Sequence, residues 1–144
     1  MQDTREELKK RLRAIYSETT VDHILAPRNR HAIPHADGFA HYTGEDGESM
    51  KIWLRIRNHI VEHAGFQTDG CAATIACGSM ATELIRSKTI DEALSITGHD
   101  IAAALVDLPP GNLHCAELAA GAVRKAVLDY LELRRQPWKR WYRT

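Results

Sequence analysis

The strongest constraint on the fold is a pair of alternating segments that meet at a two-residue turn. Residues 50–57 and 60–67 each alternate apolar and polar side chains, a period typical of half-buried β-strands. Asn58-His59 lies between them and favours a tight turn, because asparagine tolerates a positive φ. The side chains expected on the buried face are Ile52, Leu54 and Ile56 in the first strand and Ile60, Ala64 and Phe66 in the second. The sequence therefore predicts an antiparallel hairpin with one wet face.

Helical periodicity flanks this hairpin on both sides. The predicted helices cover about residues 4–16, 18–25, 71–86, 89–96, 99–108 and 113–135, and a short edge strand covers about 39–42. Strands followed by a run of helices indicate an α+β fold, here a two-layer domain with a three-stranded antiparallel sheet, helices packed on one face and a long C-terminal helix. We expect a single domain over residues 1–144, with an N-terminal helix in residues 1–15 and an aromatic and basic tail in residues 136–144.

Charge and cysteine content narrow the class of protein. Nineteen basic side chains balance nineteen acidic ones, so the broad attraction that drives binding to nucleic-acid backbones is missing. No run approaches the roughly 20 apolar residues of a membrane span, and the charged N-terminus argues against a signal peptide. Three cysteines are too few and odd in number for a disulfide scaffold. We therefore expect a cytoplasmic protein without a nucleic-acid or membrane partner.

Two of the cysteines lie where a helix is predicted to begin. Cys71 follows Gly70, and Cys115 follows His114 at the start of the last helix. A helix N-terminus favours the thiolate, so both cysteines are candidates for reactive thiols and metal ligands. A buried, inert thiol is the alternative at each position, because free cysteine is among the most buried residue types. Cys77 lies about 240° around the helix from Cys71, and we expect it to be a buried apolar residue.

Several short motifs occur in one order along residues 16–130. They are Val21-Asp22-His23, Pro27-Arg28-Asn29, Gly47-Glu48-Ser49-Met50-Lys51, residues 66–71, Ser79-Met80-Ala81-Thr82-Glu83, residues 88–94, Leu108-Pro109-Pro110 and Leu113-His114-Cys115. With these motifs the chain resembles the IscU/NifU-type scaffold proteins of iron–sulfur cluster assembly, including the SufU-like members. Many motifs in one order are far more specific than any one of them.

The resemblance implies both a fold and a site. Proteins of this family have a compact α+β fold in which three cysteines, an acidic residue and a histidine meet at one exposed end. There they hold zinc or iron, or build a 2Fe–2S cluster, with sulfur passed as persulfide from a cysteine desulfurase. By position, Cys71, His114 and Cys115 match ligands, Glu48 matches the acidic ligand, and Cys115 matches the sulfur acceptor.

The first cysteine of the family pattern is missing. Asp46 stands at that position, although the loop is short enough that Glu45 is an alternative. Carboxylate oxygen is a harder ligand than thiolate sulfur, so Asp46 with Cys71, His114 and Cys115 suits a tetrahedral zinc site. Clusters are usually held by thiolates, and Asp46 cannot carry a persulfide. A cluster at this site is therefore expected to be labile, shared between two chains in a homodimer, or absent.

The resemblance favours a non-enzymatic scaffold that binds iron, zinc or a 2Fe–2S cluster and accepts sulfur. The alternatives are a zinc-bound persulfide acceptor that acts as a sulfurtransferase partner of a desulfurase, and a degenerate regulatory paralogue. The expected partners are a cysteine desulfurase and recipient apo-proteins. Gly111-Asn112 interrupts the Pro-Pro-Val-Lys type of motif, which argues against a dedicated chaperone. The tail with Trp138 and Trp141 either packs on the domain or docks a partner.

Overall fold

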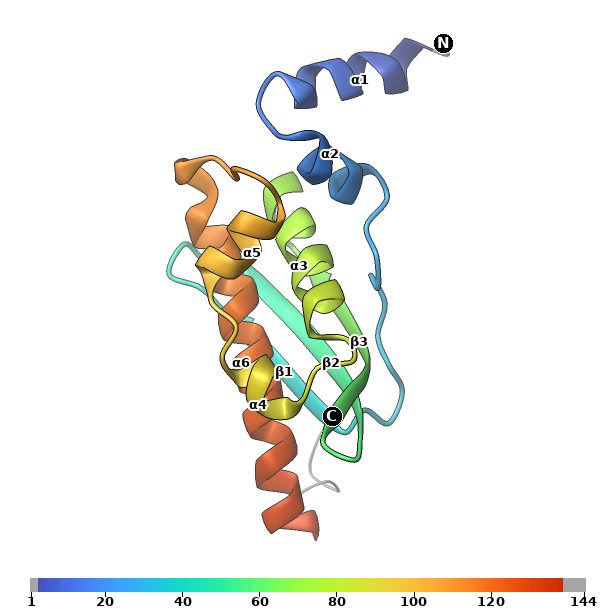
Figure 1. Ribbon diagram of the computed structural model, residues 1–144, viewed down its shortest axis with the longest axis vertical. Coiled ribbons are helices and arrows are strands. Elements are labelled where there is room, and N and C mark those ends of the chain that lie inside the picture. The colour runs from blue at the N-terminus through green and yellow to red at the C-terminus, as the bar shows by residue number, and fades with distance from the viewer. Residues whose placement is uncertain (1–2, 139–144) are drawn as a thin grey trace.

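A three-stranded sheet with helices on one face forms the core of the computed structural model, which describes residues 3–138 (Figure 1). The elements along the chain are α1 (Asp3–Arg13), α2 (Glu18–Leu25), β1 (Gly38–Thr43), β2 (Ser49–Arg57), β3 (Ile60–Thr68), α3 (Ala72–Ile85), α4 (Ile90–Leu94), α5 (Gly98–Ala104), the 3₁₀ turn η1 (Pro110–Asn112) and α6 (Leu113–Arg135). The strand order is β1-β2-β3, all antiparallel. Helices α3 and α6 lie on the sheet, and α4 and α5 pack on α6. The predicted α+β fold is confirmed.

The hairpin between β2 and β3 forms at the predicted turn. Asn58 and His59 both have positive φ, 53° and 62°, as the tight connection requires. Along β2 the alternation is regular, and its core-facing residues Ile52, Leu54 and Ile56 are buried as predicted. The buried apolar side chains of β2 therefore lie under α6, while α3 packs on β3.

Strand β3 departs from the predicted alternation near its start. The register shifts between Arg55, which pairs with His63, and Ile56, which pairs with Val61, so Glu62 is an extra residue that forms a bulge. The bulge reverses the faces on its N-terminal side: Val61 is fully buried and Ile60 is 42% exposed. The prediction that Ile60 faces the core is wrong, whereas Ala64 and Phe66 are buried as predicted.

Small residues allow α6 to approach the sheet closely. A Cβ at Gly121 would lie 2.5 Å from the ring of Tyr42, and a Cβ at Gly38 would lie 2.5 Å from the Ala126 carbonyl oxygen. Glycine at both positions therefore permits backbone-to-side-chain and backbone-to-backbone contact between β1 and α6. This close packing brings the first turn of α6 next to the loop between β1 and β2.

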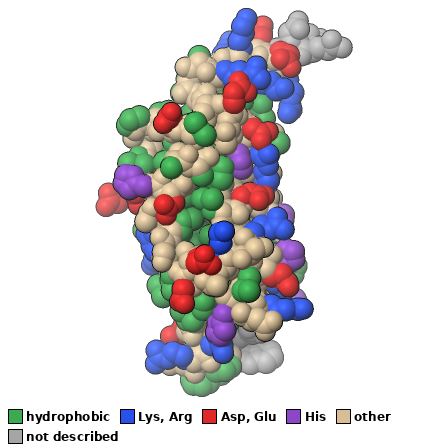
Figure 2. Space-filling view, viewed as in Figure 1, with side chains coloured by type: hydrophobic (Ala, Val, Ile, Leu, Met, Phe, Trp, Pro, Cys, Tyr) green, Lys and Arg blue, Asp and Glu red, His purple; other side chains and the backbone are tan. Residues whose placement is uncertain are grey.

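Helix α1 extends beyond the rest of the fold, next to α2 (Figure 1). Figure 2 shows acidic and basic side chains mixed over this face of the molecule, including the region of α1. Among residues 3–138, no helix is both long enough and apolar enough to span a membrane. Most of the aromatic and basic tail, residues 139–144, lies outside the described residues.

Candidate metal centre

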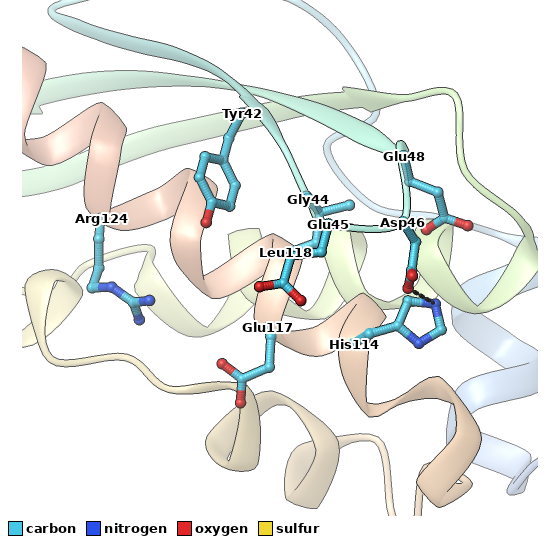
Figure 3. Close-up of a pocket in the computed structure, with 9 residues that line it drawn as sticks. All are labelled: Tyr42, Gly44, Glu45, Asp46, Glu48, His114, Glu117, Leu118 and Arg124. Carbon is cyan, nitrogen blue, oxygen red and sulfur yellow. Dashed lines mark ion pairs between the residues drawn. The ribbon is translucent and has the colours of Figure 1, made fainter.

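Two helix starts and one loop meet at the same end of the molecule. Cys71 is the N-cap of α3, and His114 and Cys115 lie in the first turn of α6. The loop of residues 44–48 connects β1 to β2 and faces the start of α6 (Figure 3). The antiparallel pairing of β1 with β2 fixes the ends of this loop, because Gly44 donates a backbone hydrogen bond to the Glu48 carbonyl. The fold thus brings together residues that are far apart in the sequence.

A carboxylate, an imidazole and a thiol converge at this end. One ligand atom each from Glu48, His114 and Cys115 lies within 4.8 Å of the others. His114 Nε2 is 3.5 Å from Cys115 Sγ and 3.4 Å from Asp46 Oδ2. Figure 3 shows Asp46 and His114 facing one another across the loop. Of the two carboxylates considered for the missing cysteine position, Asp46 is the one that contacts the histidine, and Glu45 lines the neighbouring pocket.

The hydroxyl of Thr74 connects the remaining groups. Thr74 Oγ1 donates to Glu48 Oε2 at 2.8 Å, and it lies 3.3 Å from Cys115 Sγ and 3.6 Å from Cys71 Sγ. We call the whole group the thiol end: Asp46, Glu48, Cys71, Thr74, His114 and Cys115. It contains the five predicted ligands, of which Glu48, His114 and Cys115 form the set with ligand atoms within 4.8 Å of one another, while Cys71 and Asp46 are joined to it through Thr74 and His114. Thr74 was missed, since a threonine in the first turn of a helix has no spacing pattern that marks it.

The two thiols at this end differ in acidity. Burial raises the pKa of Cys71, but its contact with the Thr74 side chain and the hydrogen bonds from the backbone N–H groups of Thr74 and Ala73 outweigh it, so the pKa is below its usual value. Cys115 is fully buried, and this burial raises its pKa to about 11. The lowered pKa of Cys71 agrees with the expectation that a helix start favours its thiolate, whereas burial has the opposite effect on the pKa of Cys115. A bound cation would favour the thiolate of either residue.

Two further residues lie near the thiols. Cys77 is fully buried, and burial raises its pKa above the usual range, in agreement with its predicted role as an apolar core residue. Tyr16, between α1 and α2, is half-buried. Burial raises the pKa of its phenol, and the nearby thiols Cys71 and Cys115 raise it further. Tyr16 packs against the buried core, and the N-terminal segment lies at the end of the molecule where α3 and α6 begin (Figure 1), which the sequence analysis did not predict.

A pocket of about 340 Å³ opens beside the thiol end. Its lining combines acidic loop residues with Tyr42 of β1 and with Glu117 and Arg124 of α6 (Figure 3). The Arg124 guanidinium donates to the Ile96 carbonyl at 2.8 Å, which fixes this wall of the pocket. The pocket leaves the ligand atoms of the loop and of His114 accessible from solvent.

The donor set fits zinc or iron. Two thiolates, one imidazole and two carboxylates are available, and a four-coordinate site needs four of these five groups. Thiolate and imidazole suit zinc and iron, while carboxylate adds harder oxygen ligands. Cys71, His114 and Cys115 with a carboxylate from Glu48 or Asp46 are therefore the residues that could hold such an ion.

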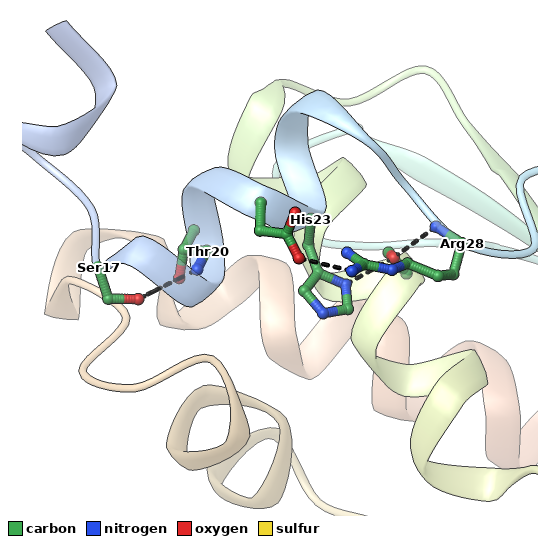
Figure 4. A network of polar contacts seen from close by, with 6 residues as sticks. Ser17, Thr20, His23 and Arg28 are labelled. Atoms are coloured by element: carbon green, nitrogen blue, oxygen red, sulfur yellow. Dashed lines mark hydrogen bonds and ion pairs between the residues drawn. The ribbon is translucent and has the colours of Figure 1, made fainter. Parts of the chain in front are cut away.

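A second polar group lies between α2 and α3 (Figure 4). His23 Nδ1 is 2.7 Å from Ser79 Oγ, and the Arg28 backbone N–H donates to the same oxygen at 2.8 Å. The Arg28 guanidinium also pairs with Asp22, although its Nη1 atom is buried without a hydrogen-bond partner. We call Asp22, His23, Arg28 and Ser79 the α2–α3 network. Its residues belong to motifs that carried the resemblance, and here they connect two helices.

Comparison with known protein families identifies this architecture. Residues 15–136 match the family described as the NifU-like N terminal domain. The chain belongs to this family. The match spans every element from α2 to α6, and it includes both the thiol end and the α2–α3 network.

Relatives within the family are similar over most of their length. The chain is 44% identical over 117 residues to a protein of Archaeoglobus fulgidus named iron-sulfur cluster assembly scaffold protein IscU 1, covering 81% of this chain and 76% of that one. It is 38% identical over 120 residues to the protein named iron-sulfur cluster assembly scaffold protein IscU of Escherichia coli K12, covering 80% and 93%. Among solved structures, a NifU-like N-terminal protein from Brucella abortus superposes with a TM-score of 0.70 at 15% identity, covering 82% and 95% of the two chains, which supports the fold.

Proposed function

We propose that this chain is a scaffold on which an iron–sulfur cluster is assembled. The observation that carries the proposal is the convergence of Cys71, His114, Cys115 and a carboxylate at one end of a NifU-like fold. The relatives at 44% and 38% identity are named as scaffolds of this process. Iron and sulfur are the substrates, a cysteine desulfurase supplies the sulfur, and apo-proteins receive the product. Free thiols suit a reducing compartment such as the cytoplasm.

Sulfur enters at Cys115 in this proposal. The Cys115 sulfur attacks the outer sulfur of a donor persulfide, the bond between the two donor sulfurs breaks, and the proton of the Cys115 thiol ends on the donor thiolate. Because Cys115 is fully buried, the donor must displace the loop of residues 44–48 or the neighbouring exposed groups to reach it. Cys71 is exposed and has the lower pKa, so it is the competing acceptor.

Anaerobic reconstitution tests the scaffold. Purified protein is incubated with ferrous iron, cysteine and a cysteine desulfurase, and absorption and Mössbauer spectra are recorded. We expect 2Fe–2S spectra from the wild type and from the Cys77→Ala control, and none from Cys71→Ser. Failure of the wild type to form any cluster while its thiols titrate as intact would contradict the proposal. Sulfur transfer is followed with labelled cysteine. If Cys115→Ser still takes up the label and Cys71→Ser does not, Cys71 is the sulfur acceptor in place of Cys115.

A zinc-bound sulfur acceptor is the second candidate. It is favoured by Asp46, whose Oδ2 lies 3.4 Å from His114 Nε2 and supplies oxygen where the family pattern has a thiolate. Elemental analysis of anaerobically purified wild type and Asp46→Cys distinguishes the two. Stoichiometric zinc in the wild type, with cluster formation only after Asp46→Cys, would favour the acceptor over the scaffold. A dimer that appears only with the cluster would show that a second copy supplies the missing ligand.

A further inference from the structure

The hydroxyl of Thr74 is shared by three candidate ligands. It donates to Glu48 Oε2 at 2.8 Å and lies 3.3 Å from Cys115 Sγ and 3.6 Å from Cys71 Sγ. The distance to Glu48 is short and the acceptor is charged, so the carboxylate is the preferred recipient of the single hydroxyl proton. Thr74 therefore stands between the two thiols and directs the carboxylate toward them.

The position of Thr74 is fixed by its surroundings. The side chain is fully buried, so solvent cannot replace the contacts of its hydroxyl. A Cβ at Gly70 would lie 2.6 Å from Thr74 Cβ and 2.6 Å from its Cγ2, so glycine is required for this close contact. Threonine is also branched at Cβ, which restricts its χ1 in a helix. The hydroxyl is thus held in place. Glu48, by contrast, is only half-buried, and its long side chain can adopt several rotamers.

We propose that Thr74 is a positioning residue that holds the Glu48 carboxylate at the metal site between Cys71 and Cys115. The inference rests on the proposed metal-binding function of the thiol end. Without the hydroxyl, the Glu48 side chain rotates toward solvent, and the site loses a preoriented oxygen ligand. Outer-shell groups that orient a ligand typically change metal affinity by about 10–100-fold when they are removed.

The test measures affinity for Zn²⁺ and the absorption spectrum of bound Co²⁺. Thr74→Val keeps the shape of the side chain and removes the hydroxyl, and we expect about 10–100-fold weaker Zn²⁺ binding with an altered Co²⁺ ligand-field band. Thr74→Ser keeps the hydroxyl and should restore both the affinity and the spectrum. Thr82→Val is the matched control, because Thr82 is also fully buried on α3 but bonds to Asn29 and to the α3 backbone.

A double-mutant cycle tests whether Thr74 acts through Glu48. If it does, the double variant Glu48→Ala/Thr74→Val should bind Zn²⁺ as tightly as Glu48→Ala alone. Wild-type and Thr74→Val proteins with equal affinity and equal spectra would overturn the positioning role and leave metal binding intact. Absence of Zn²⁺ and Co²⁺ binding by the wild type would instead refute the proposed function. If circular dichroism shows that Thr74→Val does not fold, Thr74→Ala replaces it in the same cycle, with the same two outcomes.

Discussion

The thiol end and the α2–α3 network each include a buried hydroxyl of helix α3, and they differ in whether their polar side chains could still bind a further ligand. Thr74 of the thiol end and Ser79 of the α2–α3 network are five residues apart, about 7.5 Å along the axis. Both are fully buried hydroxyls. Ser79 Oγ accepts a hydrogen bond from the Arg28 backbone N–H and shares another with His23 Nδ1, so its hydroxyl is used in contacts between α2, α3 and the segment after α2. Thr74 instead contacts two thiols and the carboxylate of Glu48, and Glu48 lines a pocket that is open to solvent.

The two groups have similar residue types but different expected roles. Histidine, hydroxyl and acidic side chains occur in both groups, and both groups fall within the family match. In the α2–α3 network these side chains bond to each other and connect helices, which stabilises the fold. At the thiol end they share one small region and keep capacity for a further ligand. Changes at the thiol end should therefore affect metal binding, and changes in the network should affect stability.

Loss of a thiol is the most severe test of this division. We expect Cys115→Ser and Cys71→Ser each to weaken Zn²⁺ binding by more than about 100-fold, since removing a ligand exceeds the effect of an outer-shell change. Chelator competition measures the affinity, and urea unfolding checks that the fold persists. Cys77→Ala is the control, because this thiol is buried and outside the thiol end. Equal Zn²⁺ affinity in Cys115→Ser and Cys77→Ala would show that Cys115 is not a ligand.

A change at Gly70 should affect both stability and binding. The added Cβ of Gly70→Ala would clash with the Thr74 side chain near its branch point, and such overpacking typically costs about 1–3 kcal/mol. We expect a lower free energy of unfolding together with weaker Zn²⁺ binding. Gly111→Ala is the matched control beside the same site, because a Cβ there meets no atom within 4 Å. Equal stabilities of the two variants would show that Gly70 does not support Thr74.

Removal of the Ser79 hydroxyl should destabilise the fold and leave metal binding unchanged. In Ser79→Ala, the buried His23 ring and the Arg28 N–H both lose their partner, and one unsatisfied buried group costs about 1–3 kcal/mol. Urea unfolding measures the loss, and Zn²⁺ affinity is measured in parallel. Ser95→Ala removes an exposed serine that bonds to Asp91 and should cost much less. A large drop in Zn²⁺ affinity in Ser79→Ala would contradict the separation of the two groups.

Much of the fold could be predicted because its signals are local. The alternation of β2, the Asn58-His59 turn and the helix after Gly70 each depend on neighbouring residues. The bulge at Glu62 could not be predicted, because it depends on pairing with β2, and it reversed the expected orientation of Ile60. The resemblance to the IscU/NifU-type family identified the candidate metal ligands. The spacing of these residues along the sequence could not show that they lie close together in the fold.

The acidity of the thiols was harder to predict than their location. Both thiols lie at a helix start, and the helix dipole acts on each. The pKa of Cys115 is raised because α3 and the sheet bury it, and burial is a property of the packed fold. Thr74 escaped notice for a similar reason: its importance comes from contacts with Glu48 and Cys115, which are 26 and 41 residues away in the sequence. Tertiary packing therefore decides whether the acidity expected of a thiol at a helix start is found in the folded protein.

The smallest expected effect is a pH dependence of stability that originates in the α2–α3 network. Burial lowers the pKa of His23, and the Arg28 cation lowers it further, against the opposing effect of Asp22 and Glu83. The unfolded chain therefore binds a proton more readily, at a pKa of about 6.5, than the folded chain does. The free energy of unfolding should fall as the pH drops below about 6.5, by up to about 1.4 kcal/mol per pH unit, until the folded-state pKa is reached.

Urea unfolding between pH 5 and 8 measures this slope. His23→Asn keeps a polar group near Ser79 but cannot take up the proton, so its stability should depend less on pH than that of the wild type. His99→Asn replaces an exposed histidine outside both polar groups and should keep the wild-type slope. Zn²⁺ affinity of His23→Asn at pH 7 should match the wild type, because His23 contacts the network and not the thiol end. An unchanged slope in His23→Asn would show that this network does not sense pH.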